Sequence, residues 1–86
     1  MKDEKVDEVV RGLELPGVAE WYIETGPDAT GDDAVWVWLI LEEEDVDFDT
    51  RSDLRRRVFD GVREAGGETP PWVYVRFRTV AEERPA

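Results

Sequence analysis

The side chains that most often perform catalysis are missing from this chain, which has neither histidine nor cysteine among its 86 residues. Those two residue types supply the commonest general bases, nucleophiles and metal ligands. Ser52 is the only serine, and it lies in the first turn of an expected helix with no base beside it. A Ser–Lys pair would need Lys2 or Lys5, both in an exposed amino-terminal helix. We therefore predict that the protein is not an enzyme; an enzyme that works with carboxylates alone is a remote alternative.

Three alternating aspartates could bind a cation. Asp45, Asp47 and Asp49 match the first three ligand positions of a calcium-binding loop. The sixth position holds Thr50 where such loops need Gly, and the twelfth holds Arg56 in place of a bidentate Glu. We interpret this segment as a solvated acidic loop, with weak incidental binding of Ca²⁺ or Mg²⁺ as the alternative. We predict no metal site and no cofactor.

Two glycines have the spacing of a phosphate-binding loop. Gly26 and Gly31 are followed by Asp32 and Asp33, where that motif requires Lys and then Ser or Thr. The segment also joins two expected strands, whereas a phosphate-binding loop leads from a strand into a helix. We interpret residues 26–33 as the loop of a hairpin.

Arg55, Arg56 and Arg57 form a short basic run. At 100° per residue they spread over about 200° of a helix, so they form no single patch. Asp53 and Asp60 lie nearby on the same helix. Ion pairs within the helix are one interpretation of this run, and a docking site for an acidic partner is the other.

Hydrophobic periodicity predicts the elements that position these residues. Helices are expected over residues 3–11 and 50–65, and strands over residues 18–25, 34–42 and 72–79. Thr50 is expected to begin the second helix. Val46 and Phe48 are expected to anchor the acidic connection before it. Gly61, within that helix, suggests a close approach of the helix to the sheet.

The helix between the second and third strands indicates a right-handed crossover, which places these strands parallel and adjacent. With the hairpin, this predicts an α+β fold: a two-layer sandwich in α-β-β-α-β order, with a three-stranded mixed sheet and two helices on one face. We expect residues 1–86 to form a single small domain. Its ordered core is expected over about residues 3–80, followed by a charged C-terminal tail, residues 81–86.

The strands carry more apolar side chains than one covered face can use, because side chains on a strand alternate between the two faces of the sheet. The face toward the helices is expected to hold Trp21, Ile23, Val35, Val37, Leu39, Leu41, Val73, Val75 and Phe77. The opposite face, called the aromatic face below, is expected to hold Tyr22, Trp36, Trp38, Ile40, Trp72 and Tyr74, with Glu20 and Glu24 on one edge strand and Arg76 and Arg78 on the other.

Aromatic and arginine side chains are enriched at the centres of protein interfaces, and an apolar patch of this size exceeds what monomers usually expose. We predict that the aromatic face is an interaction surface. Self-association as a homodimer would set Arg76 and Arg78 near Glu20 and Glu24 of the second chain. Another protein is the next candidate partner. The alternatives are a small regulatory ligand-binding domain with a pocket at a subunit interface, stacking of single-stranded nucleic-acid bases, and coverage of the face by the first helix or the tail.

The charge balance limits the partners. With 22 acidic and 11 basic residues the net charge is −11, which opposes nucleic-acid binding because that function needs a basic footprint. The chain also lacks Asn and Gln, and Arg outnumbers Lys. Adaptation to high salt accounts best for this composition; a GC-rich genome and then a hot habitat are the alternatives.

Size and hydropathy complete the expectations. A chain of 86 residues buries a marginal core, so an added interface would be a natural source of stability. No apolar segment follows the charged start, and the longest apolar run, residues 34–41, is far shorter than the ~20 residues that span a bilayer. We expect a cytoplasmic protein without membrane contact.

The α-β-β-α-β order, with Leu15, Pro16, Gly17 and Val18 leading into the first strand, resembles the small cytosolic domain of cation-diffusion-facilitator transporters. The likeness spans residues 3–80 and is one of element pattern. The metal-binding histidines of that family have no counterpart in a chain without His, and its membrane part is absent. The resemblance implies a dimerising module, and no site residue is carried over from it.

Overall fold

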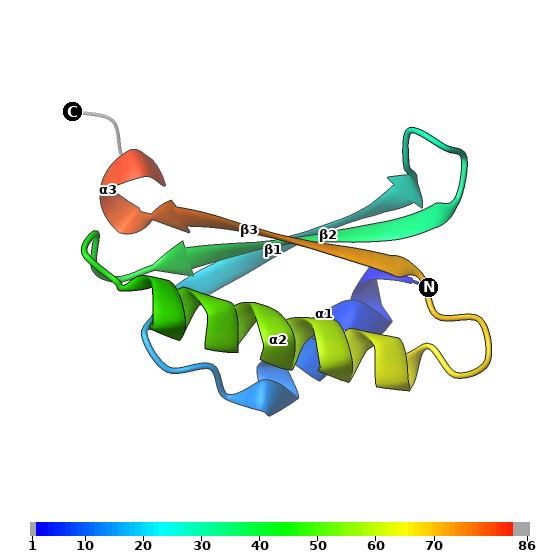
Figure 1. Ribbon diagram of the computed structural model, residues 1–86, viewed down its shortest axis with the longest axis horizontal. Coiled ribbons are helices and arrows are strands. Elements are labelled where there is room, and N and C mark those ends of the chain that lie inside the picture. The colour runs from blue at the N-terminus through cyan, green and yellow to red at the C-terminus, as the bar shows by residue number, and fades with distance from the viewer. Residues whose placement is uncertain (1, 84–86) are drawn as a thin grey trace.

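The computed structural model describes residues 2–83 and has the expected α-β-β-α-β order, followed by one short additional helix (Figure 1). The helices are α1 (Asp3–Leu13), α2 (Phe48–Ala65) and α3 (Val80–Glu83), and the strands are β1 (Val18–Pro27), β2 (Asp33–Leu41) and β3 (Trp72–Thr79). Residue 1 and residues 84–86 of the expected domain and tail lie outside the described residues.

The sheet has the predicted topology. β2 is central, β1 pairs with it antiparallel through the hairpin, and β3 pairs with it parallel after the crossover through α2. Figure 1 shows α1 and α2 together on one side of the sheet and α3 on the other. The prediction of a two-layer α+β domain with a mixed sheet is therefore confirmed.

The core lies between the sheet and the two long helices. Its buried members are Val6, Val10, Leu54, Val58 and Val62 from the helices and Val35, Val37, Leu39, Leu41, Val73 and Val75 from the strands. Trp21, Ile23 and Phe77 pack at its margin. Each fully buried side chain of this size contributes roughly 1.5–3 kcal/mol relative to an exposed one. The predicted assignment of residues to the helix-covered face is confirmed.

α2 begins two residues earlier than expected because Asp47, and not Thr50, caps it. The Asp47 carboxylate accepts a hydrogen bond from the backbone N–H of Thr50 at 2.8 Å. Phe48 thereby becomes the first helical residue, six positions and about 240° around the helix from the buried Leu54. It is 77% exposed, so the prediction that Phe48 anchors the connection is wrong, whereas Val46 does pack against the core.

Gly61 allows a close approach, but of α2 to α1 and not to the sheet. A Cβ at this position would lie 3.3 Å from both Leu13 Cδ2 and Val9 Cγ1. Leu13 is the last residue of α1, which runs past the expected end at residue 11 because Leu13 extends its apolar stripe onto the core. Gly61 therefore sets the distance between the two helices.

Candidate interaction surface

The strand register assembles the aromatic face in rows that cross from β1 through β2 to β3. The rows are Glu24–Trp36–Tyr74, Tyr22–Trp38–Arg76 and Glu20–Ile40–Arg78, with Ala34 and Trp72 paired at one end. The acidic residues thus lie on one edge strand and the arginines on the other, as the alternation predicted.

The rings at the centre of the aromatic face are stacked and partly covered by arginine side chains. Trp36 and Tyr74 stack with ring centroids 5.6 Å apart and planes 17° apart. The Arg78 guanidinium lies over the Trp38 ring at 5.0 Å from its centroid. Arg76 lies 5.9 Å from the centroid of Tyr74. Such contacts are worth about 0.5–1 kcal/mol at exposed sites, so they order the face without removing it from solvent.

Ile40 does not contribute to the exposed surface, which corrects the sequence-based expectation. Its side chain is fully buried although the register places it on the aromatic face. α3 lies on this side of the sheet, next to the ends of β2 and β3 (Figure 1). The Thr79 hydroxyl accepts a hydrogen bond from the backbone N–H of Glu82, which holds the start of this helix. The chain after β3 therefore covers one end of the aromatic face and leaves the centre open.

Trp72 also departs from the expected position. It pairs with Ala34 in the register, yet its ring lies 5.6 Å from the guanidinium of Arg63, which belongs to α2 on the opposite layer. Because β3 is the edge strand of the described sheet, no further strand within residues 2–83 stops the indole from leaning over the edge. Trp72 is 52% exposed and contributes to the β3 edge more than to the centre of the aromatic face.

The hairpin loop borders the other end of the aromatic face. The Asp28 carboxylate accepts hydrogen bonds from the Thr30 hydroxyl at 2.7 Å and from the backbone N–H of Thr30 and Asp32. The Tyr74 hydroxyl donates to the same carboxylate at 3.3 Å, which ties the loop to β3. The hydrogen bond from Thr30 lowers the pKa of Asp28. The pKa of Tyr74 is raised, mainly by burial and secondly by the negative charge of Asp28. The Tyr74 hydroxyl therefore keeps its proton and donates it to the Asp28 carboxylate in this hydrogen bond.

A hollow of about 290 Å³ lies on the aromatic face, lined by Tyr22, Glu24, Trp38 and Arg78. Tyr22 is 46% exposed, and its hydroxyl donates to the Glu20 carboxylate at 2.9 Å. The hollow thus offers ring surfaces flanked by one acidic and one basic side chain. This combination suits a side chain or small molecule that is apolar in the middle and polar at both ends.

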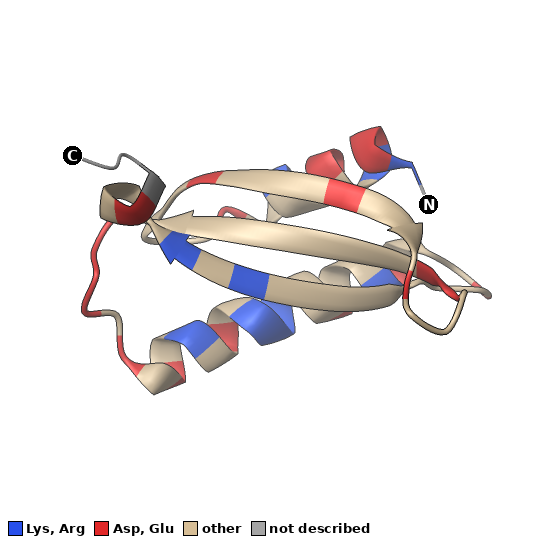
Figure 2. Cartoon of the chain, turned by 90° about the horizontal axis from the view of Figure 1, so that it is seen from above, with Lys and Arg blue, Asp and Glu red and all other residues tan. Residues whose placement is uncertain are grey.

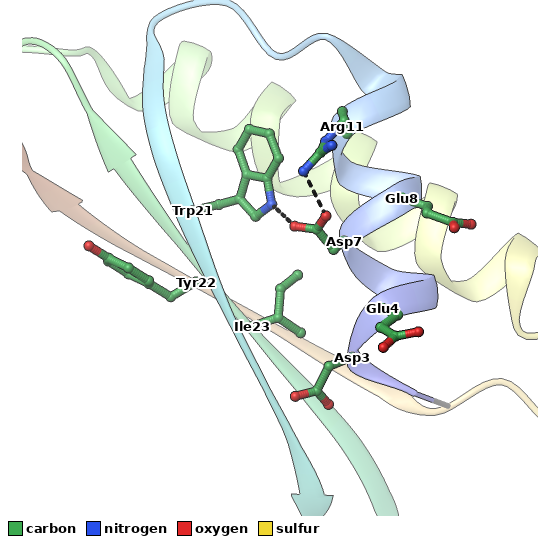
Figure 3. Close-up of a pocket in the computed structure, with 8 residues that line it drawn as sticks. All are labelled: Asp3, Glu4, Asp7, Glu8, Arg11, Trp21, Tyr22 and Ile23. Carbon is green, nitrogen blue, oxygen red and sulfur yellow. Dashed lines mark hydrogen bonds and ion pairs between the residues drawn. The ribbon is translucent and has the colours of Figure 1, made fainter.

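Figure 3 shows a second hollow, of about 560 Å³, between α1 and β1, which sequence reasoning missed. It is lined by Asp3, Glu4, Asp7, Glu8, Arg11, Trp21, Tyr22 and Ile23. Asp7 accepts from Trp21 Nε1 at 2.8 Å and pairs with Arg11 at 3.0 Å, and Asp3 accepts from the Thr25 hydroxyl. Between residues 2 and 83, acidic side chains do not gather in a geometry that could hold a metal ion. The repeat of acids four residues apart in α1 was the only signal for this hollow in the sequence.

Comparison of the chain with protein-family models, with curated proteins and with solved structures found no match. The resemblance to the cytosolic domain of cation-diffusion-facilitator transporters therefore rests on element order alone. Of the helices within the described part of the chain, none has both the length and the apolar character that crossing a membrane requires.

Proposed function

We propose that this protein is a non-catalytic module that associates with a second copy of itself through the aromatic face. The observation that carries the proposal is the charge arrangement across that face (Figure 2). Glu20 and Glu24 lie on β1, Arg76 and Arg78 lie on β3, and β2 between them presents uncharged rings. The face carries equal numbers of these acidic and basic side chains on a chain whose net charge is −11, so two copies that meet there escape much of the repulsion between their acidic surfaces.

The charge arrangement also selects the symmetry. In a face-to-face dimer, a two-fold axis parallel to the strands places β1 of one copy over β3 of the other, so carboxylates meet guanidiniums. An axis across the strands would place β1 over β1 and repeat like charges. Complementary potentials favour the first arrangement, which is self-complementary as a two-fold interface must be. The small size of the domain supports the same conclusion, because an interface adds buried surface to a marginal core.

Sedimentation velocity at about 0.15 M and about 2 M NaCl tests the proposal. We expect the wild-type chain to be a dimer. The substitution Trp38→Glu should yield a monomer, because it buries a carboxylate at the centre of the contact. Far-UV circular dichroism should show unchanged helix content. A wild-type monomer at both salt concentrations contradicts the proposal.

A charge-reversal pair guards against the case in which Trp38→Glu unfolds the chain. One chain carries Arg76→Glu with Arg78→Glu, and the other carries Glu20→Arg with Glu24→Arg. Each alone should be monomeric, and their mixture should form a heterodimer. Arg56→Glu, an exposed change on the helix layer, is the matched control and should leave the dimer intact.

The hollow beside Trp38 favours one second candidate, a small regulatory ligand-binding domain. Glu24 and Arg78 could hold the two ends of a zwitterionic aromatic compound whose ring contacts Trp38. A rise in Tm with such a compound, lost in Trp38→Phe but not in Arg56→Glu, would favour this candidate.

A further inference from the structure

The edge of the sheet at β3 carries an unusual concentration of arginine. β3 pairs only with β2, and within residues 2–83 its backbone makes no other strand pairing, so its outer N–H and C=O groups are unpaired by any strand. The side chains along this edge are Arg51, Arg55 and Arg63 from α2 and Arg76 from β3 itself, and we call this set the arginine edge. In Figure 2 the blue bands of β3 lie on the opposite edge of the sheet from the red bands of β1, next to the blue bands of α2.

The three α2 members of the arginine edge are held by aromatic rings of β3. Arg55 and Arg51 lie 5.3 and 5.9 Å from the centroid of the Phe77 ring. Arg63 lies 5.6 Å from the centroid of Trp72. A ring beneath a guanidinium fixes the long side chain while the N–H donors at its rim can still bind a carboxylate in bidentate fashion. These arginines are therefore preorganised for an acidic ligand.

These three arginines also lack acidic partners. Within the described part of the chain, none of Arg51, Arg55 and Arg63 forms an ion pair, although acids outnumber bases two to one in the sequence. The buried Nε of Arg51 has no hydrogen-bond acceptor. By contrast, Arg57 pairs with Asp53 at 2.9 Å, so within residues 2–83 the basic run in α2 divides into one residue with an ion pair and two without, Arg55 and Arg56.

We propose that the arginine edge binds an extended acidic segment of another protein, which adds to β3 as a fourth strand. An added strand would pair its amides with the open edge of β3 and direct alternate side chains to the two layers. In a segment of alternating acidic and apolar residues the carboxylates share one side, where they would meet Arg51 and Arg55, and the apolar side chains would lie on the side of the aromatic face. A nucleic acid could supply anions but no amide ladder, and its dense charge is opposed by the net −11 of the chain.

Fluorescence anisotropy with a labelled peptide of about eight alternating Glu and Val residues tests this inference, because that length matches a strand. We expect binding that weakens as salt rises. A peptide with Pro in place of Val keeps the charge but lacks every second backbone N–H and fits a strand poorly, so it should bind much more weakly. A Lys–Val peptide should not bind. Equal binding of the Pro peptide, no binding of the Glu–Val peptide at low salt, or tighter binding of an oligothymidine of the same charge would overturn the inference.

Matched variants locate the site. Arg55→Glu should weaken peptide binding at least about tenfold, because it replaces a charge-assisted contact by repulsion. Arg56→Glu is the control, because it makes the same change of charge at the next residue. Within residues 2–83, Arg56 makes no ring contact and no ion pair. This variant should weaken peptide binding less than about threefold. Equal losses in the two variants would show a general charge effect and contradict the assigned site. Trp38→Glu should retain peptide binding, so this test is independent of the proposed dimer.

Discussion

Asp47 shows how one side chain positions an element. Its carboxylate caps α2 by accepting a hydrogen bond from the backbone N–H of Thr50. The pKa of Asp47 lies below its ordinary value, mainly because of the Thr50 hydroxyl and secondly because of this backbone hydrogen bond. A carboxylate with these hydrogen bonds in the folded state alone is ionised more readily there than in the unfolded chain. Its contribution to stability is therefore present above the ordinary Asp pKa of ~3.9, and it is lost as the pH falls through the lower folded pKa.

We expect Asp47→Ala to lower Tm at pH 7 by about 4–8 °C, because the first turn of α2 loses its side-chain acceptor. The difference between this variant and the wild type should shrink as the pH falls below ~3.9, since protonation removes the acceptor charge from the wild type as well. Thermal melts followed by circular dichroism between about pH 7 and pH 2 measure both effects.

Asp47→Asn is the matched control for this prediction. Asparagine caps helices about as well as aspartate and does not titrate, so this variant should be close to the wild type at pH 7. It should show less loss of stability on acidification than the wild type does. An Asp47→Ala variant whose Tm difference from the wild type stays constant down to pH 2 would contradict the assigned role.

At the scale of elements, the packing of α1 on α2 depends on a glycine that helix propensity disfavours. Gly61 lies against Leu13 and Val9 of α1, whereas a Cβ added at Gly12 of α1 would meet no atom within 4 Å. Both glycines lie in helices, so Gly→Ala at each position should bring a similar gain in helix propensity. Any difference in stability between the two variants then reports the packing of α1 on α2. The gain from propensity alone is up to ~1 kcal/mol for Gly→Ala in a helix interior.

Gly12→Ala should raise the free energy of unfolding by roughly 0.5–1 kcal/mol, and Gly61→Ala should change it less, because the new methyl group meets Leu13 and Val9. Gly61→Val should cost about 1–3 kcal/mol, since a larger side chain forces the helices apart. Urea denaturation of the three variants measures these values. Equal stabilisation by Gly12→Ala and Gly61→Ala would show that α1 and α2 do not approach closely at this point.

The helices and strands could be predicted from the sequence where the hydrophobic pattern was long and a single physical rule determined the arrangement. Strand alternation assigned Val73, Val75 and Phe77 to the helix-covered face, and the crossover rule placed β3 beside β2. The start of α2 was missed because Asp47 with Thr50 and Thr50 with Asp53 both have cap spacing, and local sequence does not rank them.

The parts of the candidate site that escaped prediction depend on neighbours distant in sequence. Alternation assigned Ile40 to the aromatic face correctly, but α3 covers it, and a helix of four residues is too short to show periodicity. The ring of Trp72 leans toward Arg63 because β3 is an edge, which the residue types alone do not state. The arginine edge could not be predicted from the sequence either, because its members come from two elements that only the fold brings together.

At the scale of the whole molecule, the net charge of −11 is unevenly distributed. Acidic residues dominate α1, β1 and the connection that precedes α2, while arginines gather along β3 and the adjoining side of α2 (Figure 2). The ion pairs of Arg11 with Asp7 and of Arg57 with Asp53 are exposed and contribute little to stability. Repulsion among the remaining carboxylates therefore opposes folding, and salt should relieve it.

We expect Tm to rise on the order of 5 °C between about 0.02 M and 1 M NaCl, because the screening length falls from more than 20 Å to about 3 Å over this range. Substituting residues 42–45, which are exposed acids in one run, by Gln and Asn removes four negative charges and should flatten the rise. Both chains are measured at several protein concentrations, so that any contribution of dimer formation appears as a concentration dependence. A Tm that is independent of salt in the wild type, or a rise of equal size in the neutralised variant, would show that these carboxylates do not limit stability.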